Sequence, residues 1–235
     1  CEMAVKLIAS DLDGTLLTNK KELSPRTREA LDLAAAQGIY LVPATGRSFE
    51  SVPEMIREYP GVEYLITANG GAVYSVSEKK RVYQCLMTPE SVDAAIAVRK
   101  REKMVMEVVV DGVPYAEEAY VRDPIRYLAT EYGARYIKAT RTPVKDIIEF
   151  AAQHAKELDS ISFVCSHEDR NRLYTSLEKE IPDIYVTSCQ IFSKWGTKMQ
   201  GKAKLYCGFW INSGSPRKKR WHLVTQTTTA VCWKQ

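Results

Sequence analysis

Apolar residues in the first third of the chain gather in short continuous runs that polar turns separate. Residues 5–9, 39–42 and 64–67 form such runs, which are typical of strands buried in a parallel sheet. Between the first two runs, Ser24 and Pro25 mark the start of a helix and Gly38 lies where that helix would end. The pattern therefore predicts a strand, a helix and a second strand.

A second helix is predicted from about Ser51 to Tyr59, because Pro60 and Gly61 follow as a stop. Strands and helices that alternate in this order need crossover connections, which are right-handed and produce a parallel sheet. The beginning of the chain therefore predicts an α/β fold.

The pattern changes after residue 71. Segments 72–74 and 81–83 predict one hairpin, and Asp111-Gly112 predicts another, because Asp-Gly between β-prone segments favours a tight turn. Further expected elements are helices at 89–103 and 168–180, and strands at 104–110, 113–115, 161–164 and 184–186. We interpret residues 82–187 as an inserted α+β module, with 1–81 as the first part of the core and 188–235 as its remainder.

Composition narrows the class of protein. Of the 235 residues, 45% are hydrophobic and 26% charged, as in ordinary globular proteins. No apolar run approaches the roughly 20 residues of a membrane span, and the N-terminus lacks the zones of a secretory signal, so we expect no membrane partner. The six cysteines lack paired spacing, which favours reduced thiols and a cytoplasmic location over disulfides or a zinc site.

Charge is distributed unevenly along the chain. Residues 191–235 contain no Asp or Glu but seven Lys and two Arg, and all four tryptophans lie there. The preceding 190 residues carry 24 basic against 29 acidic side chains. The basic run at residues 217–220 could indicate nucleic-acid binding, but we expect no nucleic-acid partner because the last quarter has an atypical composition throughout.

Two carboxylates follow the first predicted strand directly. Asp11 could attack phosphorus as a nucleophile, and Asp13 could protonate the leaving oxygen and then activate water. Gly14 permits a tight turn whose backbone N–H groups can bind a phosphoryl group. Paired carboxylates also suit a hard cation such as Mg²⁺. The alternative is an ordinary turn, in which Asp and Gly are common.

Polar turns also end the second and third predicted strands. Thr45, Gly46 and Arg47 follow the second strand, where the hydroxyl and guanidinium groups could bind phosphoryl oxygens. Asn69 and Gly70 follow the third strand. Each turn alone is as well explained by a helix cap or a β-turn, but ligands bind where parallel strands end, so together the turns predict a site.

The segments 11–17, 44–47 and 67–71, in this order, resemble the haloacid dehalogenase superfamily, and more narrowly its Cof-type phosphatases of subfamily IIB. The resemblance implies a Rossmann-like core with an inserted C2B cap. It also implies Asp11 as the phosphorylated nucleophile, Asp13 as the acid/base, Thr45 as phosphate anchor, and Mg²⁺ held by Asp11 and the Asp13 carbonyl. The expected phosphate- and substrate-binding residues are Leu12, Gly14, Thr45, Gly46, Arg47, Asn69 and Gly70.

The resemblance implies a Mg²⁺-dependent phosphatase that hydrolyses small phosphorylated metabolites, such as sugar phosphates, through an aspartyl-phosphate. Two alternatives stay open: an inactive relic of such an enzyme, and a phosphomutase. The sequence leaves the oligomeric state undetermined.

The last quarter departs from the family. Members carry a lysine and a G-D-x-x-N-D segment after the cap; Lys198, Lys202 and Lys204 are candidates for the lysine, but no acidic residue follows Asp183. In a shifted reading frame, the last base of each codon joins the first two bases of the next. In that frame the codons of Trp221 and His222 must encode Ala. Residues 223–235 then permit G-D-[AST]-[ND]-[ND]-[ND]-[GSC]-x-M-L-E-A. We therefore hypothesise a frameshift near Ser188 or Cys189.

Overall fold

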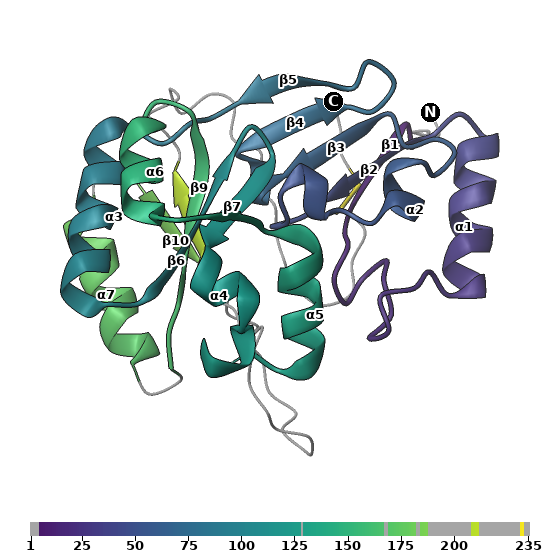
Figure 1. Ribbon diagram of the computed structural model, residues 1–235. Coiled ribbons are helices and arrows are strands. Elements are labelled where there is room, and N and C mark those ends of the chain that lie inside the picture. Colours follow the sequence, from purple (N-terminus) through teal and green to yellow (C-terminus); the bar gives the residue numbers. More distant parts are fainter. Residues whose placement is uncertain are drawn as a thin grey trace. The chain divides into compact units, whose positions relative to one another are not determined.

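The computed structural model describes residues 5–127, 129–166 and 169–181, together with strand segments 184–187, 208–211 and 231–232. The chain divides into two units, one comprising Cys1–Gln84 with Ser215–Gln235 and the other comprising Cys85–Gly214. Each contains its own six-stranded sheet and helices (Figure 1). The predicted α/β class is confirmed.

The sheet of the first unit has the strand order β12-β1-β2-β3-β4-β5. The first three strands in the chain are parallel to one another, as predicted, whereas β4 is antiparallel to β3 and β5 is antiparallel to β4. The strands are β1 (Leu7–Asp11), β2 (Tyr40–Ala44), β3 (Tyr64–Thr67), β4 (Ala72–Ser75), β5 (Lys80–Gln84) and β12 (Val231–Cys232).

Helix α1 (Pro25–Ala36) begins and ends close to where the sequence predicts. The Ser24 side chain caps it by accepting a hydrogen bond from the Thr27 N–H at 3.1 Å, and Gly38 turns the chain away with a left-handed φ of 70°. Leu31 and Ala34 of this helix pack into a buried apolar cluster with Leu41 of β2 and Leu65 of β3. This packing covers one face of the sheet.

The helix predicted from Ser51 to Tyr59 is wrong in extent. The structure instead has a 3-10 turn at Phe49–Ser51 and a short helix α2 (Glu54–Arg57). Pro53 separates them, because proline lacks an N–H and forces the residue before it out of the helical region. Val52 accordingly has φ −75° and ψ 129°, which is extended backbone.

The sheet of the second unit has the strand order β10-β11-β9-β6-β7-β8, and only β7 and β8 are parallel among its described pairs. The hairpin predicted at Asp111-Gly112 is confirmed: both residues have positive φ, at 47° and 76°. The strands are β6 (Val105–Val110), β7 (Val113–Glu117), β8 (Thr142–Val144), β9 (Leu158–Val164), β10 (Ile184–Thr187) and β11 (Gly208–Ile211).

Alternation along β6 places the two faces of this sheet against different helices. Met106 and Val108 pack into a cluster with α3, α6 and α7, whereas Val105 packs with α4 and α5 on the other face (Figure 1). The helices are α3 (Pro89–Glu102), α4 (Glu118–Arg122), α5 (Glu131–Thr140), α6 (Ile147–Gln153) and α7 (Arg170–Glu180). The second unit thus has a helical layer on each side of its sheet.

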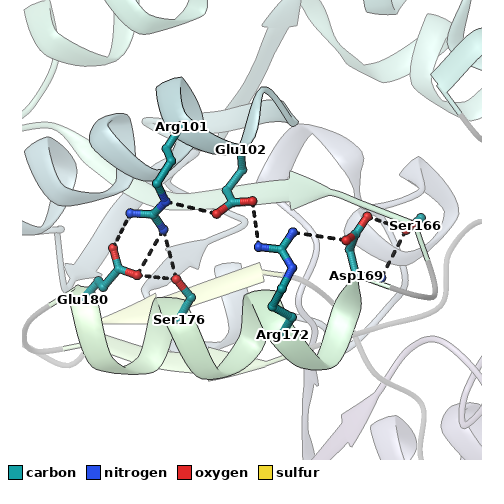
Figure 2. Close-up of polar contacts among 7 residues, drawn as sticks. All are labelled: Arg101, Glu102, Ser166, Asp169, Arg172, Ser176 and Glu180. Atoms are coloured by element: carbon teal, nitrogen blue, oxygen red, sulfur yellow. Dashed lines mark hydrogen bonds and ion pairs between the residues drawn. The ribbon is translucent and has the colours of Figure 1, made fainter.

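Helices α3 and α7 are joined by a chain of polar contacts along their exposed sides (Figure 2). Arg101 of α3 pairs with Glu180 of α7 at 2.7 Å, and Glu102 of α3 pairs with Arg172 of α7 at 2.8 Å. Arg172 also pairs with Asp169, which accepts a hydrogen bond from the Ser166 hydroxyl. Alternating charges therefore reinforce the apolar packing between these two helices.

Several elements were not predicted, namely α4, α5, α6, β8, β11 and β12. Within the described part of the chain, no helix has the length and apolar character needed to cross a bilayer. Apart from β11 and β12, residues 188–235 lie outside the described residues, and so does the proposed frameshift point.

Candidate active site

The first of the three polar turns begins where β1 ends. Asp11 is the last residue of this strand, and the fully buried Leu12 anchors the turn that follows. The Leu12 N–H donates to Asp11 Oδ1 at 2.8 Å, and the Leu16 N–H donates to the Asp11 carbonyl at 3.1 Å. Gly14 is exposed and has φ 86°, a conformation that favours glycine. The turn therefore holds the candidate nucleophile at the end of a parallel strand.

Asp13 accepts hydrogen bonds from two cationic side chains. The Arg47 guanidinium donates from Nε to Asp13 Oδ2 and from Nη2 to Oδ1, both at 2.8 Å, and Lys21 Nζ donates to Oδ1 at 2.6 Å. Burial alone would raise the pKa of Asp13, but the hydrogen bonds and charges of Arg47 and Lys21 together lower that pKa to about 2. Asp13 is thus an ionised carboxylate at neutral pH.

The turn after β2 contacts the turn that carries Asp11 and Asp13. Thr45 is buried, and its hydroxyl accepts a hydrogen bond from the Arg47 N–H at 3.2 Å. The Arg47 guanidinium also donates from Nη1 to the Ser51 carbonyl at 3.0 Å, so this group is held from two sides, by Asp13 and by Ser51. These contacts join the end of β2 to the Asp11–Asp13 turn.

The turn after β3 interlocks with the turn after β2. The Asn69 N–H donates to the Thr45 carbonyl at 2.9 Å and the Ala68 N–H to the Arg47 carbonyl at 2.8 Å. Ala68, Asn69 and Gly70 all have positive φ, at 45°, 55° and 97°. This left-handed turn places the Asn69 side chain against Gly46, where a Cβ atom would overlap with Asn69 Oδ1. Glycine at position 46 therefore permits the close approach of the two turns.

The structure thus brings the three predicted turns together within the first unit. Direct contacts join Asp13 to Arg47, Thr45 to Arg47, and Asn69 to Thr45. The side chain of Leu12 is enclosed in the core, so what it offers to the site is its backbone N–H. Lys21 was not predicted, because a lysine in a polar loop eight residues after Asp13 has no distinctive pattern.

The donors needed for Mg²⁺ are present only in part. The Asp11 carboxylate and the Asp13 carbonyl are oxygen ligands of the kind Mg²⁺ prefers. The Asp13 carboxylate, however, is occupied by Arg47 and Lys21, and among the described residues no three acidic, His or Cys side chains lie close enough together to hold a metal ion. These residues by themselves would not complete a magnesium site.

Comparison with known proteins identifies the family. A sequence profile described as haloacid dehalogenase-like hydrolase matches residues 8–201. The chain belongs to this family. This match confirms the membership of the haloacid dehalogenase (HAD) family that the three turns predicted.

Individual HAD relatives match parts of the chain. A putative phosphatase of Buchnera aphidicola is 38% identical over 79 residues, which are 34% of this chain and 29% of that protein. The pyridoxal phosphate phosphatase YbhA of Escherichia coli is 28% identical over 174 residues, 73% of this chain and 62% of that protein. The chain thus spans less than two thirds of either relative.

Solved structures support the fold. A HAD subclass IIB sugar phosphatase has a TM-score of 0.64 at 17% identity, covering 88% of this chain and 70% of that one. At this identity the likeness shows that the two chains share the subclass IIB fold.

Proposed function

We propose that the chain is a phosphatase that hydrolyses small phosphate monoesters through an aspartyl-phosphate on Asp11. The observation that carries the proposal is the placement of Asp11 at the end of a parallel strand, beside Asp13 and the interlocked Thr45 and Asn69 turns. Relatives named as phosphatases of pyridoxal phosphate and of sugars support a small phosphorylated metabolite as substrate.

In the first step, an Asp11 carboxylate oxygen attacks phosphorus, and the bond from phosphorus to the ester oxygen breaks. The leaving alkoxide takes a proton from Asp13. In the second step, water attacks the phosphorus of the acyl phosphate while Asp13 accepts a proton from that water. The P–O bond to Asp11 breaks, which releases inorganic phosphate and restores the carboxylate.

The charge state of Asp13 bears on these two steps differently. The carboxylate is ionised, as the base of the second step must be, but its pKa of about 2 makes it a weak base while both oxygens are bonded to cations. To donate a proton in the first step, the carboxylate must first take up a proton from water, which requires that Arg47 or Lys21 moves away from it. We therefore propose that substrate binding rearranges the contacts of Asp13.

From the family resemblance, we propose that the Asp11 carboxylate and the Asp13 carbonyl bind Mg²⁺. The charge of this ion would offset repulsion between the nucleophile and the phosphoryl group. The inserted second unit is proposed as the cap that closes over the substrate. The unpaired spacing of the cysteines supports a reducing compartment such as the cytoplasm.

Release of phosphate from p-nitrophenyl phosphate, with and without Mg²⁺, tests the proposal. We expect turnover that EDTA removes and that Asp11→Asn abolishes. The matched control Asp93→Asn, at an exposed position on α3, should keep full activity. Turnover that survives Asp11→Asn would contradict the proposal, and transfer of phosphate within a sugar phosphate instead of its release would favour a phosphomutase.

A second candidate is a catalytically impaired member of the family. Residues 191–235 contain no carboxylate side chain to complete a metal site. This observation supports a displaced reading frame after about residue 188. Sequencing the coding DNA tests this candidate, as does an in-frame chain: activity there, with none in the present chain, would establish it.

A further inference from the structure

Lys21 adds a positive charge to the ion pair of Asp13 and Arg47, which is already neutral without it. The Arg47 guanidinium already donates to both oxygens of the Asp13 carboxylate, each at 2.8 Å. Lys21 Nζ adds a third cationic hydrogen bond at 2.6 Å to the same group. With Asp11 included, the site contains two carboxylates and two cations. Without Lys21 the site would have a net negative charge and would repel an anionic substrate.

The loop that contains Lys21 fixes the position of this residue. Leu17 and Leu23 are buried on either side of it and form a β-bridge with each other. The Lys21 N–H donates to the Thr18 carbonyl at 2.8 Å, and Lys21 has φ 64°, a left-handed conformation that lysine rarely adopts. The backbone thus turns in an unfavourable way at the residue whose side chain reaches Asp13.

Lys21 is also the more accessible of the two cations. Its side chain is 32% exposed, against 13% for Arg47, which is further held by the Ser51 carbonyl. An ammonium group has three donors, and among the described residues Lys21 Nζ makes one hydrogen bond, to Asp13. We propose that Lys21 is a phosphate-binding residue, whose ammonium group contacts the phosphoryl dianion of the substrate. This inference rests on the proposed phosphatase function and adds a ligand to that site.

Calorimetric titration with inorganic phosphate, on the full chain, tests the proposal. We expect Lys21→Met to weaken phosphate binding roughly 10- to 100-fold, as the loss of a charged hydrogen bond would. Lys21→Arg should retain binding within a few-fold, because it keeps the cation. The matched control Lys20→Met, at the exposed neighbouring position, should bind as the wild type does. Equal binding by Lys21→Met and the wild type would overturn the proposal.

A second pair of variants separates direct contact from an effect through Asp13. In an Asp13→Asn background, Lys21 has no carboxylate to neutralise. If Lys21 contacts phosphate, Lys21→Met weakens binding there by a similar factor; if it acts through Asp13 alone, the effect disappears and the proposal is wrong. Wild-type protein that binds no phosphate would overturn the proposed function together with this inference. A wild type that binds and hydrolyses, with an unaffected Lys21→Met variant, would overturn the inference alone.

Discussion

At the scale of single residues, Asp13 couples the chemistry of the site to its stability. Its pKa of about 2 in the folded chain lies below the ordinary value of 3.8. A carboxyl group whose pKa is lowered by folding stabilises the folded state above its unfolded pKa, and this contribution is lost as the pH falls through the folded pKa. The pairing with Arg47 and Lys21 should therefore stabilise the chain at neutral pH and fail in acid.

The free energy of unfolding of the wild type and of Asp13→Asn, measured by urea denaturation between pH 2 and pH 6, checks this expectation. The wild type should lose about 2 kcal/mol more than the variant as the pH falls across this range. Other carboxylates titrate in both proteins, so the difference isolates Asp13. A difference that does not change with pH would show that the ion pairs contribute no net stability.

Gly46 provides a second test at this scale. Gly46→Ala would force its Cβ against the Asn69 side chain, and we expect a loss of about 1–3 kcal/mol in the free energy of unfolding. In an Asn69→Gly background the overlap is absent and glycine accepts the left-handed φ of 55°. Gly46→Ala should then cost much less. Additive effects in this double-mutant cycle would mean that the two turns do not interlock through these residues.

At the scale of elements, a buried ion pair joins β6 to the residue that follows α5. Arg141 donates to Glu107 from Nε at 3.1 Å and from Nη2 at 2.8 Å, and both side chains are about 90% enclosed. Burial alone would lower the pKa of Arg141, but the charge of Glu107 raises it. Removal of one partner leaves an uncompensated buried charge, which is more costly than the loss of the pair itself.

Glu107→Gln should therefore lower the free energy of unfolding by roughly 3–5 kcal/mol in denaturant titrations. The control Glu118→Gln, at an exposed position in α4, should change it by less than about 0.5 kcal/mol. Similar small effects for both variants would indicate that Arg141 finds another partner or reaches water.

The contacts between α3 and α7 should depend on salt, because they lie on the surface (Figure 2). Arg101→Gln should lower the melting temperature at low ionic strength, and this difference should shrink in about 1 M salt, where the screening length is about 3 Å. Lys100→Gln, also exposed on α3, is the control. A difference of the same size at both salt concentrations would show that Arg101 acts through packing and not through charge.

At the scale of the whole molecule, the parts that the sequence predicts are those with strong local signals. The parallel strands, the cap and stop of α1, and the Asp111-Gly112 hairpin all follow from apolar runs and turn residues. Helix α6 was missed because its seven residues are too few to show a helical period, and α5 was missed, despite its apolar face, because Gly133 inside it is typical of a turn. Pro53 was not recognised as a break within the second helix.

The features of the site also divide into those that the sequence predicts and those that it does not. The sequence could indicate five site residues because each lies at or just after the end of a strand, and parallel strands end at one edge of a sheet: Asp11, Asp13, Thr45, Arg47 and Asn69. The contacts between them could not be predicted. Lys21 contacts Asp13, and Asn69 packs against Gly46, because Lys21 and Asn69 have left-handed backbone conformations. A hydrophobic period in the sequence does not predict such conformations at single residues.

The central claim is that Asp11 becomes phosphorylated during turnover. Borohydride reduces an acyl phosphate on aspartate to homoserine, so chain quenched during turnover of p-nitrophenyl phosphate and then reduced can be digested and sequenced by mass spectrometry. The account predicts homoserine at position 11, dependent on substrate, with Asp13 unmodified. Turnover without modification of Asp11, or modification at another carboxylate, would contradict it.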